Sequence, residues 1–252
     1  MAPPDMPRWS TETILQVLAG QGITTVSTRD FQRLFRYSPA TTLAKLRSLA
    51  GEGVLRRFLH GWYVVRGPAE AEVLGDPMFL ATRLVEPSYV AYGSALRFHG
   101  WTKRAPPVTL VASPRRSHLR SAGGHPVRVV QVPAFRFYGF RTVRRGSLEF
   151  AVADPEKAVV DGFHHPHYFG GIRPVIAALE RAGDSLDLGR LEAYAVRMDS
   201  ESLCSRLGYV LDTLGMEPRL LPRHASQSGV KLDSRGPREG PRDSRWWVID
   251  NL

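Results

Sequence analysis

Cysteine is almost missing from this chain, which has 252 residues and a single thiol at Cys204. One cysteine cannot form an intramolecular disulfide and has no cysteine partner for a structural zinc site, which agrees with a reducing cytosol. No uninterrupted apolar run approaches the roughly 18 residues of a membrane-spanning helix. The opening MAPPDMP lacks the basic start and apolar stretch of an export signal. We therefore expect a cytoplasmic protein with no membrane partner.

Acidic residues are missing from a long central stretch. Between Glu86 and Glu149 there is no Asp or Glu. From Glu149 to Pro218 the sign reverses, with twelve acids against six bases, so the net charge of +10 conceals a basic middle and an acidic later segment. This segregation predicts a basic face for nucleic acid, unless the later acids neutralise the basic middle through ion pairs. The basic middle comprises Arg97, Lys103, Arg104, Arg115, Arg116, Arg120, Arg128, Arg136, Arg141, Arg144 and Arg145.

The signatures of common enzymes are also missing. The chain has neither a Gly-rich phosphate loop nor a Walker-type lysine, and Ser94 stands in Gly-Ser-Ala rather than in a nucleophile elbow. Glu156 and Lys157 are adjacent, whereas a metal-dependent nuclease of this type has its acid and lysine alternating on one strand. We expect Asp154 to cap a helix there. The histidines around Pro166 predict a turn rather than a metal site. We expect no catalytic residue, metal or cofactor, and a nuclease is the least favoured function.

What the chain does contain, in its first 66 residues, is a pattern of three short helices followed by a hairpin. Hydroxyl N-caps precede each apolar repeat of helical spacing, at Ser10, at Ser27 or Thr28, and at Ser38. Pro39 fits the first turn of the third helix, and Gly51 ends it. We expect the second helix to contact phosphate and the first to be buried.

The third predicted helix, over residues 39–51, gives the sharpest expectation. Its apolar side would be formed by Leu43, Leu46 and Leu49 or Ala50. The opposite side would then carry Thr41, Thr42, Lys45 and Ser48. Small hydroxyls with one long cation can enter a groove and reach base edges and thymine methyl groups. We therefore expect this helix to read bases.

The hairpin is predicted over residues 54–65, with a tight turn at His60-Gly61 and with Arg56 and Arg57 beside it. Three helices and a basic hairpin in this order predict a winged helix-turn-helix, in which one helix enters the major groove. Residues 1–66 carry nine Lys or Arg against four Asp or Glu, a balance of +5. This charge favours duplex DNA over the alternative, a winged helix that binds protein.

A second domain is expected after Gly67-Pro68, over residues 67–252. Helices are predicted around 77–85, around Ser94, over 153–161, over 191–195 and over 203–215, and strands over 108–113, 127–132 and 148–152. The expected fold class is therefore α+β: an N-terminal winged helix-turn-helix over residues 1–66 and a larger mixed α/β domain.

Several short motifs then follow one another in order. They are YVAYGSALRFHG at 89–100, VTLVAS at 108–113, VADPEKAVVD at 152–161, HYFGG at 167–171, YAVR at 194–197 and RLGYVLDTLG at 206–215. Together they resemble the AbiEi family of bacterial antitoxins over nearly the whole chain. The closing segment from Lys231 to Asn251 is similar to the final strand of that family, whereas the Pro-, Gly- and Ser-rich segment 219–242 departs from its usual ending.

The resemblance implies a transcriptional autorepressor that is also the antitoxin of a phage-defence or toxin–antitoxin operon. The winged helix would bind inverted repeats in the operon's own promoter. The C-terminal antitoxin domain would counteract a nucleotidyltransferase-like toxin, commonly without a stable complex. The alternative is a stand-alone regulator whose second domain senses a ligand or partner, which should show a concave apolar pocket with a few polar groups.

The predicted DNA contacts come from the helices, the hairpin and the acid-free stretch, where Arg115 and Arg116 would extend the footprint. They are Thr28, Ser38, Thr41, Thr42, Lys45, Ser48, Arg56, Arg57, His60, Arg115 and Arg116.

Overall fold

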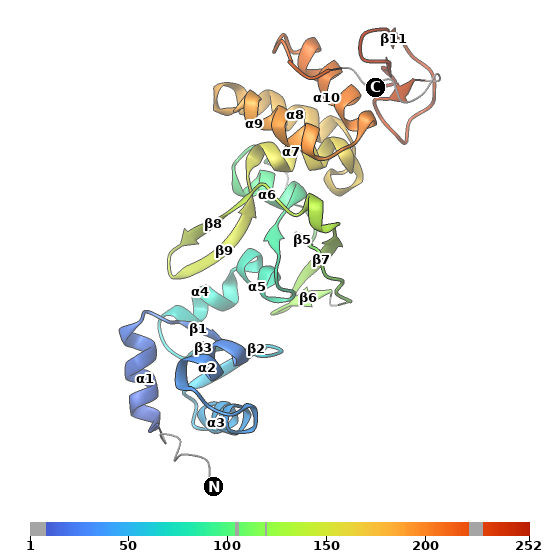
Figure 1. Ribbon diagram of the computed structural model, residues 1–252. Coiled ribbons are helices and arrows are strands. Elements are labelled where there is room, and N and C mark those ends of the chain that lie inside the picture. The colour runs from blue at the N-terminus through green and yellow to red at the C-terminus, as the bar shows by residue number, and fades with distance from the viewer. Residues whose placement is uncertain (1–8, 104–105, 119, 222–228) are drawn as a thin grey trace.

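The computed structural model describes residues 9–103, 106–118, 120–221 and 229–252. It is a mixed α and β protein with an elongated outline (Figure 1). The first helices lie at one end, a large sheet lies in the middle, and the last long helices lie at the other end. Residues 222–228 of the Pro- and Gly-rich segment, and Arg104 of the basic middle, lie outside the described residues.

The N-terminal helices begin where the sequence predicts them. Ser10, Ser27 and Ser38 each accept a hydrogen bond from the backbone N–H three residues later, at 3.1, 3.0 and 3.2 Å. These caps satisfy donors that a helix start leaves unpaired, and Ser27 rather than Thr28 caps the second helix. The elements are α1 (Thr11–Gly20), β1 (Thr25–Ser27), α2 (Thr28–Phe35), α3 (Pro39–Gly51), β2 (Leu55–Leu59) and β3 (Trp62–Val65).

The three strands form a small antiparallel sheet in the order β1-β3-β2. Gly61 makes the turn between β2 and β3 with φ of 73°, a conformation that favours glycine, as predicted. One side of the sheet packs with α1, α2 and α3 around Ile14, Phe31 and Leu46. The other side contributes Val64 to the core of the rest of the chain. The sequence does not reveal β1, because three residues carry too little alternation.

Two short helices, α4 (Ala69–Gly75) and α5 (Pro77–Arg83), connect this unit to the rest. The sequence predicts α5, whose N–H groups at Met78 and Phe79 both bond to Asp76 Oδ1 at 3.0 Å. It does not predict α4, which begins without a side-chain cap. Phe58 of β2 packs against Phe79, with ring centroids 6.4 Å apart. The small sheet therefore rests on the connecting helices.

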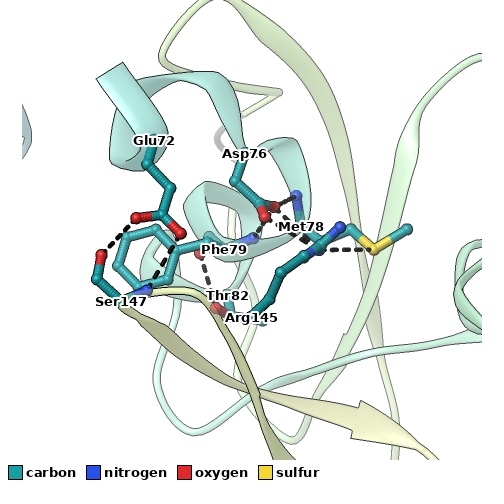
Figure 2. Close-up of polar contacts among 7 residues, drawn as sticks. All are labelled: Glu72, Asp76, Met78, Phe79, Thr82, Arg145 and Ser147. Atoms are coloured by element: carbon teal, nitrogen blue, oxygen red, sulfur yellow. Dashed lines mark hydrogen bonds and ion pairs between the residues drawn. The ribbon is translucent and has the colours of Figure 1, made fainter. Parts of the chain in front are cut away.

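Polar contacts also tie the connecting helices to the large sheet (Figure 2). Glu72 accepts hydrogen bonds from the N–H and Oγ of Ser147, at 3.1 and 2.7 Å. Arg145 pairs with Asp76, Nη2 to Oδ2, at 3.0 Å. Between these contacts Gly146 has φ of +57°, and a Cβ atom there would collide with Glu72 Oε1. Only glycine fits this turn without displacing Glu72.

A six-stranded sheet of order β6-β7-β5-β4-β9-β8 forms the middle of the molecule, with β5·β7 and β4·β9 parallel and the other pairs antiparallel. The sequence predicts β5, β7 and β9. It misses β8, an edge strand whose side chains are mostly exposed. The strands are β4 (Tyr89–Val90), β5 (Thr109–Ser113), β6 (Ser121–Ala122), β7 (His125–Gln131), β8 (Phe140–Arg145) and β9 (Leu148–Ala153).

Helices cover the end of the sheet that lies away from the N-terminal unit (Figure 1). They are α6 (Tyr92–Phe98), α7 (Pro155–His164), α8 (Arg173–Ala182), α9 (Leu188–Arg197) and α10 (Glu201–Thr213). Single 3₁₀ turns are η1 (Ala134–Arg136), η2 (Pro166–Phe169) and η3 (Gly183–Ser185). The chain closes with the short strands β10 (Val230–Lys231), β11 (Arg242–Asp243) and β12 (Val248–Ile249). In the described part of the chain, no helix is both long and apolar enough to cross a membrane.

The charged segments pair separately. The later acids pair with later cations: Asp161 with Lys157, Glu156 and Asp187 with Arg190, and Asp212 with Arg245. Among the residues that the structure describes, no ion pair joins the basic middle to the acidic segment after Glu149. Arg145 is the member of the basic middle that has an acidic partner there, and that partner is Asp76. Among the described residues of the basic middle, all except the half-buried Arg136 are exposed.

Candidate nucleic-acid interface

Helix α3 lies at the end of the molecule farthest from the large sheet (Figure 1). Ser38 caps the helix and Pro39 occupies its first turn, as predicted. The exposed face combines small side chains with one arginine: Ala40, Thr41, Ala44, Arg47 and Ser48. Small side chains allow the backbone to approach a groove floor, and an arginine can bond to guanine in a bidentate manner.

The predicted inward side of α3 is wrong by one position. Thr42 is fully buried, whereas Leu43 is 45% exposed. The buried positions are Thr42, Leu46 and Leu49, spaced by four and three residues. Thr42 tolerates burial because its hydroxyl donates to Ser38 O at 2.8 Å, a bond within its own helix. Thr42 therefore cannot contact DNA. Leu43 replaces it at the surface, where an apolar side chain can contact a thymine methyl group.

The C-terminal half of α3 is less open to DNA than predicted. Ser48 donates to Glu52 Oε1 at 2.6 Å, and Thr11 of α1 donates to Glu52 Oε2 at 2.9 Å. These bonds lower the pKa of the Glu52 carboxyl, which keeps it ionised. A carboxylate repels phosphate, so Ser48 is a poor contact. Lys45 is half-buried at the border of the exposed face.

The two arginines of the hairpin lie on opposite sides of the small sheet. Arg56 pairs across the strands with Val64, and Arg57 with Tyr63. The Arg56 guanidinium bonds to Glu70 Oε1 of α4 at 3.0 Å, so it is directed toward the connecting helices. The exposed Arg57 lies on the side of the N-terminal helices. The predicted arginine pair is therefore divided, with Arg57 the freer cation.

The tip of the hairpin joins Arg57 to His60 and to the start of α2. Arg57 Nη2 lies 2.8 Å from His60 Nδ1, and both side chains are exposed. Thr28 donates from its N–H and its hydroxyl to Gly61 O, at 2.8 and 3.2 Å. Thr28 therefore holds the hairpin against α2, and Ser38 is occupied as the cap of α3.

Helix α2 carries basic residues that reasoning from the sequence missed. Arg29 and Arg33 are exposed and four residues apart, on the helix face opposite the buried Phe31 and Phe35. The exposed Arg36 follows them as the C-cap residue of α2, in a left-handed conformation. That spacing is visible in the sequence. Arg33 has a neighbouring acid, Asp30, at 4.0 Å. In a helix-turn-helix the first helix crosses the DNA backbone, which is where such cations would neutralise phosphate.

Arg115 and Arg116 have different surroundings. Arg115 lines a cleft of about 650 Å³ between the N-terminal unit and the large sheet, together with Arg29 of α2 and Arg83 of α5. Burial lowers the pKa of Arg83, whose guanidinium lies 4.9 Å from the Trp62 ring centroid. Glu86 and Glu149 also line this cleft. Arg116 instead donates to the Gln131 side chain at 2.7 Å.

The residues weighed for catalysis are engaged in structural bonds. Asp154 stands at the N-cap position of α7, but its side chain makes no cap bond and accepts from Tyr194 Oη at 2.7 Å. Ser94 Oγ accepts the Leu110 N–H at 2.9 Å. Lys157 and Asp161 form a buried ion pair on α7. Among the described residues, no three His, Cys, Asp or Glu side chains are grouped as metal ligands.

No protein-family model matches the chain, and no curated protein matches it.

Proposed function

We propose that this chain is a DNA-binding protein whose N-terminal unit is a winged helix-turn-helix, with α3 in the major groove and the β2–β3 hairpin as its wing. The exposed face of α3 is the observation that carries the proposal. Ala40, Thr41, Leu43, Ala44 and Arg47 are exposed, and the described part of the chain does not cover them. A face covered by the second unit would leave no room for a duplex.

The residues of this unit then divide into two roles. Arg47, Thr41 and Leu43 read base edges and methyl groups, since they project from the open face of α3. Arg57 and the arginines of α2 neutralise phosphates, which gives affinity but little sequence preference. Arg115 extends the contact beyond the N-terminal unit.

We further propose that the protein represses its own operon and acts as the antitoxin of that operon. This step rests on the motifs that resemble the AbiEi family. The antitoxin activity is assigned to residues 67–252, and the functional partner is a nucleotidyltransferase-like toxin. A stand-alone regulator would share the DNA-binding unit but would have no toxin gene beside it.

The DNA-binding proposal is tested by titrating the duplex upstream of the protein's own gene at several salt concentrations. Each phosphate neutralised contributes about 0.9 to the slope of log affinity against log salt. Arg57→Gln should reduce that slope by about one such unit. Arg56→Gln should change it less, because Glu70 already pairs with Arg56.

Arg181→Gln is the control, because Arg181 is an exposed arginine of α8 at the opposite end of the molecule. It carries the same charge change and should leave affinity and slope unaltered. Equal slopes for Arg57→Gln and the wild type would remove the hairpin from the DNA surface.

The antitoxin proposal is tested by co-expression with the product of the neighbouring gene. The full chain should restore growth that this product arrests, and a variant with Arg47→Ala and Arg57→Gln should restore it equally while losing promoter binding. A neighbouring gene that encodes no nucleotidyltransferase, or no rescue by the full chain, would favour the stand-alone regulator.

A further inference from the structure

A cavity of about 270 Å³ opens in the second unit between α6, β5, β7 and η2. Its walls are mostly apolar and include Leu96 of α6, Leu110 of β5 and Phe169 of η2. Four side chains with polar groups line it as well: Thr102, Arg128, His167 and Tyr168. An apolar cavity with a few polar groups is the usual form of a small-molecule site.

Arg128 is placed to meet a ligand at this cavity. It is the register partner of Leu110 across the parallel strands β5 and β7, so both side chains project from the same face of the sheet. Arg128 is exposed, and the described residues that line the cavity include no Asp or Glu. The absence of acids on β5 and β7 follows from the sequence, because both strands lie in the stretch without Asp or Glu. A bound anion would therefore meet an uncompensated guanidinium.

Two further features favour an anion there. Pro174, in the first turn of α8, lines the cavity, and Ile172 at the N-cap position of α8 provides no side-chain cap. The positive end of that helix dipole therefore lies near the site. Burial, with the charges of Arg235 and Arg128, lowers the pKa of His167, so its neutral ring can share a hydrogen bond with a ligand near pH 7.

We propose that this cavity binds a small organic acid, with its apolar or aromatic body between Leu96, Leu110 and Phe169 and its carboxylate on Arg128. The volume of about 270 Å³ lies just below the roughly 300 to 1,000 Å³ typical of ligand sites, which favours a small ligand. Arg128 is the one arginine among the described lining residues, which suits a carboxylate, whereas phosphate groups are usually held by clusters of cations. No lining residue belongs to the N-terminal unit, so the proposal stands apart from DNA binding.

The test is calorimetric titration of the full chain with phenylacetate and with its neutral amide, phenylacetamide. The two probes share size and ring and differ in charge. We expect saturable binding of phenylacetate at one site, with a dissociation constant of about 1 mM or tighter. The amide should bind about tenfold more weakly, because it lacks the charge-assisted hydrogen bond to Arg128.

Variants separate the site from general charge effects. Arg128→Gln should weaken the binding of phenylacetate about tenfold, to the affinity of the wild type for the amide. Arg144→Gln, on the exposed edge strand β8, should leave the binding of phenylacetate unchanged. Val108→Phe adds bulk at the half-buried wall and should abolish binding of both probes while the melting temperature confirms folding.

Three results would overturn the proposal. One is no binding of either phenylacetate or hexanoate at millimolar concentration to the folded wild type. The second is equal binding of the acid and the amide. The third is a phenylacetate affinity that Arg128→Gln leaves unchanged, since the carboxylate would then lie elsewhere.

Discussion

At the residue scale, the pair Thr41 and Thr42 decides how α3 is oriented. The two side chains are chemically identical and adjacent, yet Thr41 is exposed and Thr42 is fully buried. Leucines at 43, 46 and 49 allow either phase of the helix, and hydrophobicity alone favours burying Leu43. The structure instead buries Thr42, and that burial is tolerated because the Thr42 hydroxyl donates to Ser38 O.

This orientation gives a prediction for DNA binding. Arg47→Ala should weaken binding to the specific promoter site by about tenfold, since a good base contact contributes roughly 1–3 kcal/mol. Thr42→Val should leave the affinity within about twofold, because that side chain does not reach the surface. Competition titrations with specific and random duplexes measure both. A larger loss for Thr42→Val than for Arg47→Ala would reverse the assigned faces.

The buried ion pair between Lys157 and Asp161 gives a prediction for stability. Both side chains are almost fully inaccessible, and Asp161 Oδ2 has no hydrogen-bond partner among the described residues. Burial raises the pKa of Asp161, and the lysine opposes that change. Lys157→Met alone leaves an uncompensated carboxylate and should cost about 3–5 kcal/mol of unfolding free energy.

The double variant Lys157→Met with Asp161→Leu is the control, because it removes both charges together. In denaturant melts, the double variant should lose clearly less unfolding free energy than Lys157→Met. Equal losses would mean that packing of the lysine chain, rather than charge, sets the cost.

At the element scale, the turn between β8 and β9 fixes the connecting helices. Gly146→Ala should destabilise the protein both through its positive φ and through displacement of Glu72 from Ser147. Gly124→Ala is the matched control for Gly146→Ala. Gly124 also has a positive φ, of +85°, but a Cβ atom added there would have no other atom within 4 Å. Gly124→Ala should lower the free energy of unfolding by about 1 kcal/mol, and Gly146→Ala should lower it by about 1–2 kcal/mol more than that. Equal losses in thermal melts would show that the Glu72 contact contributes nothing.

The sequence predicts those helices and strands that local signals mark. Hydroxyl caps, Pro39 and Gly61 place α1, α2, α3 and the hairpin, because these signals are local. The sequence does not reveal α4, which lacks a cap, or β8, whose exposed side chains do not alternate. Nor does it reveal that Arg56 bonds to Glu70 on α4, since that contact depends on how the small sheet rests on the connecting helices.

At the scale of the whole molecule, two histidines make stability depend on pH. Burial lowers the pKa of His164 to about 3 and that of His165 to about 4. In the unfolded chain histidine titrates near pH 6.5, so below about 6.5 the unfolded state binds more protons. Stability should therefore fall as the pH drops from about 6.5 toward 4.

Urea melts at about pH 7.5 and about pH 5 measure this effect. The midpoint should be lower at the acidic pH, and the difference should shrink in a His164→Gln, His165→Gln variant. That comparison isolates the histidines from Asp161, whose raised pKa acts in the opposite direction. An equal difference in variant and wild type would assign the acid sensitivity to other groups.

The central claim is that α3 of the folded chain enters the major groove of promoter DNA. Methylation interference with dimethyl sulfate tests it most directly, because the reagent modifies guanine N7 in the major groove and adenine N3 in the minor groove. We predict that N7 methylation of guanines within the bound site prevents binding by the wild type, and that one such position loses its effect in Arg47→Ala. Interference confined to adenine N3, or none at any guanine, would contradict the account.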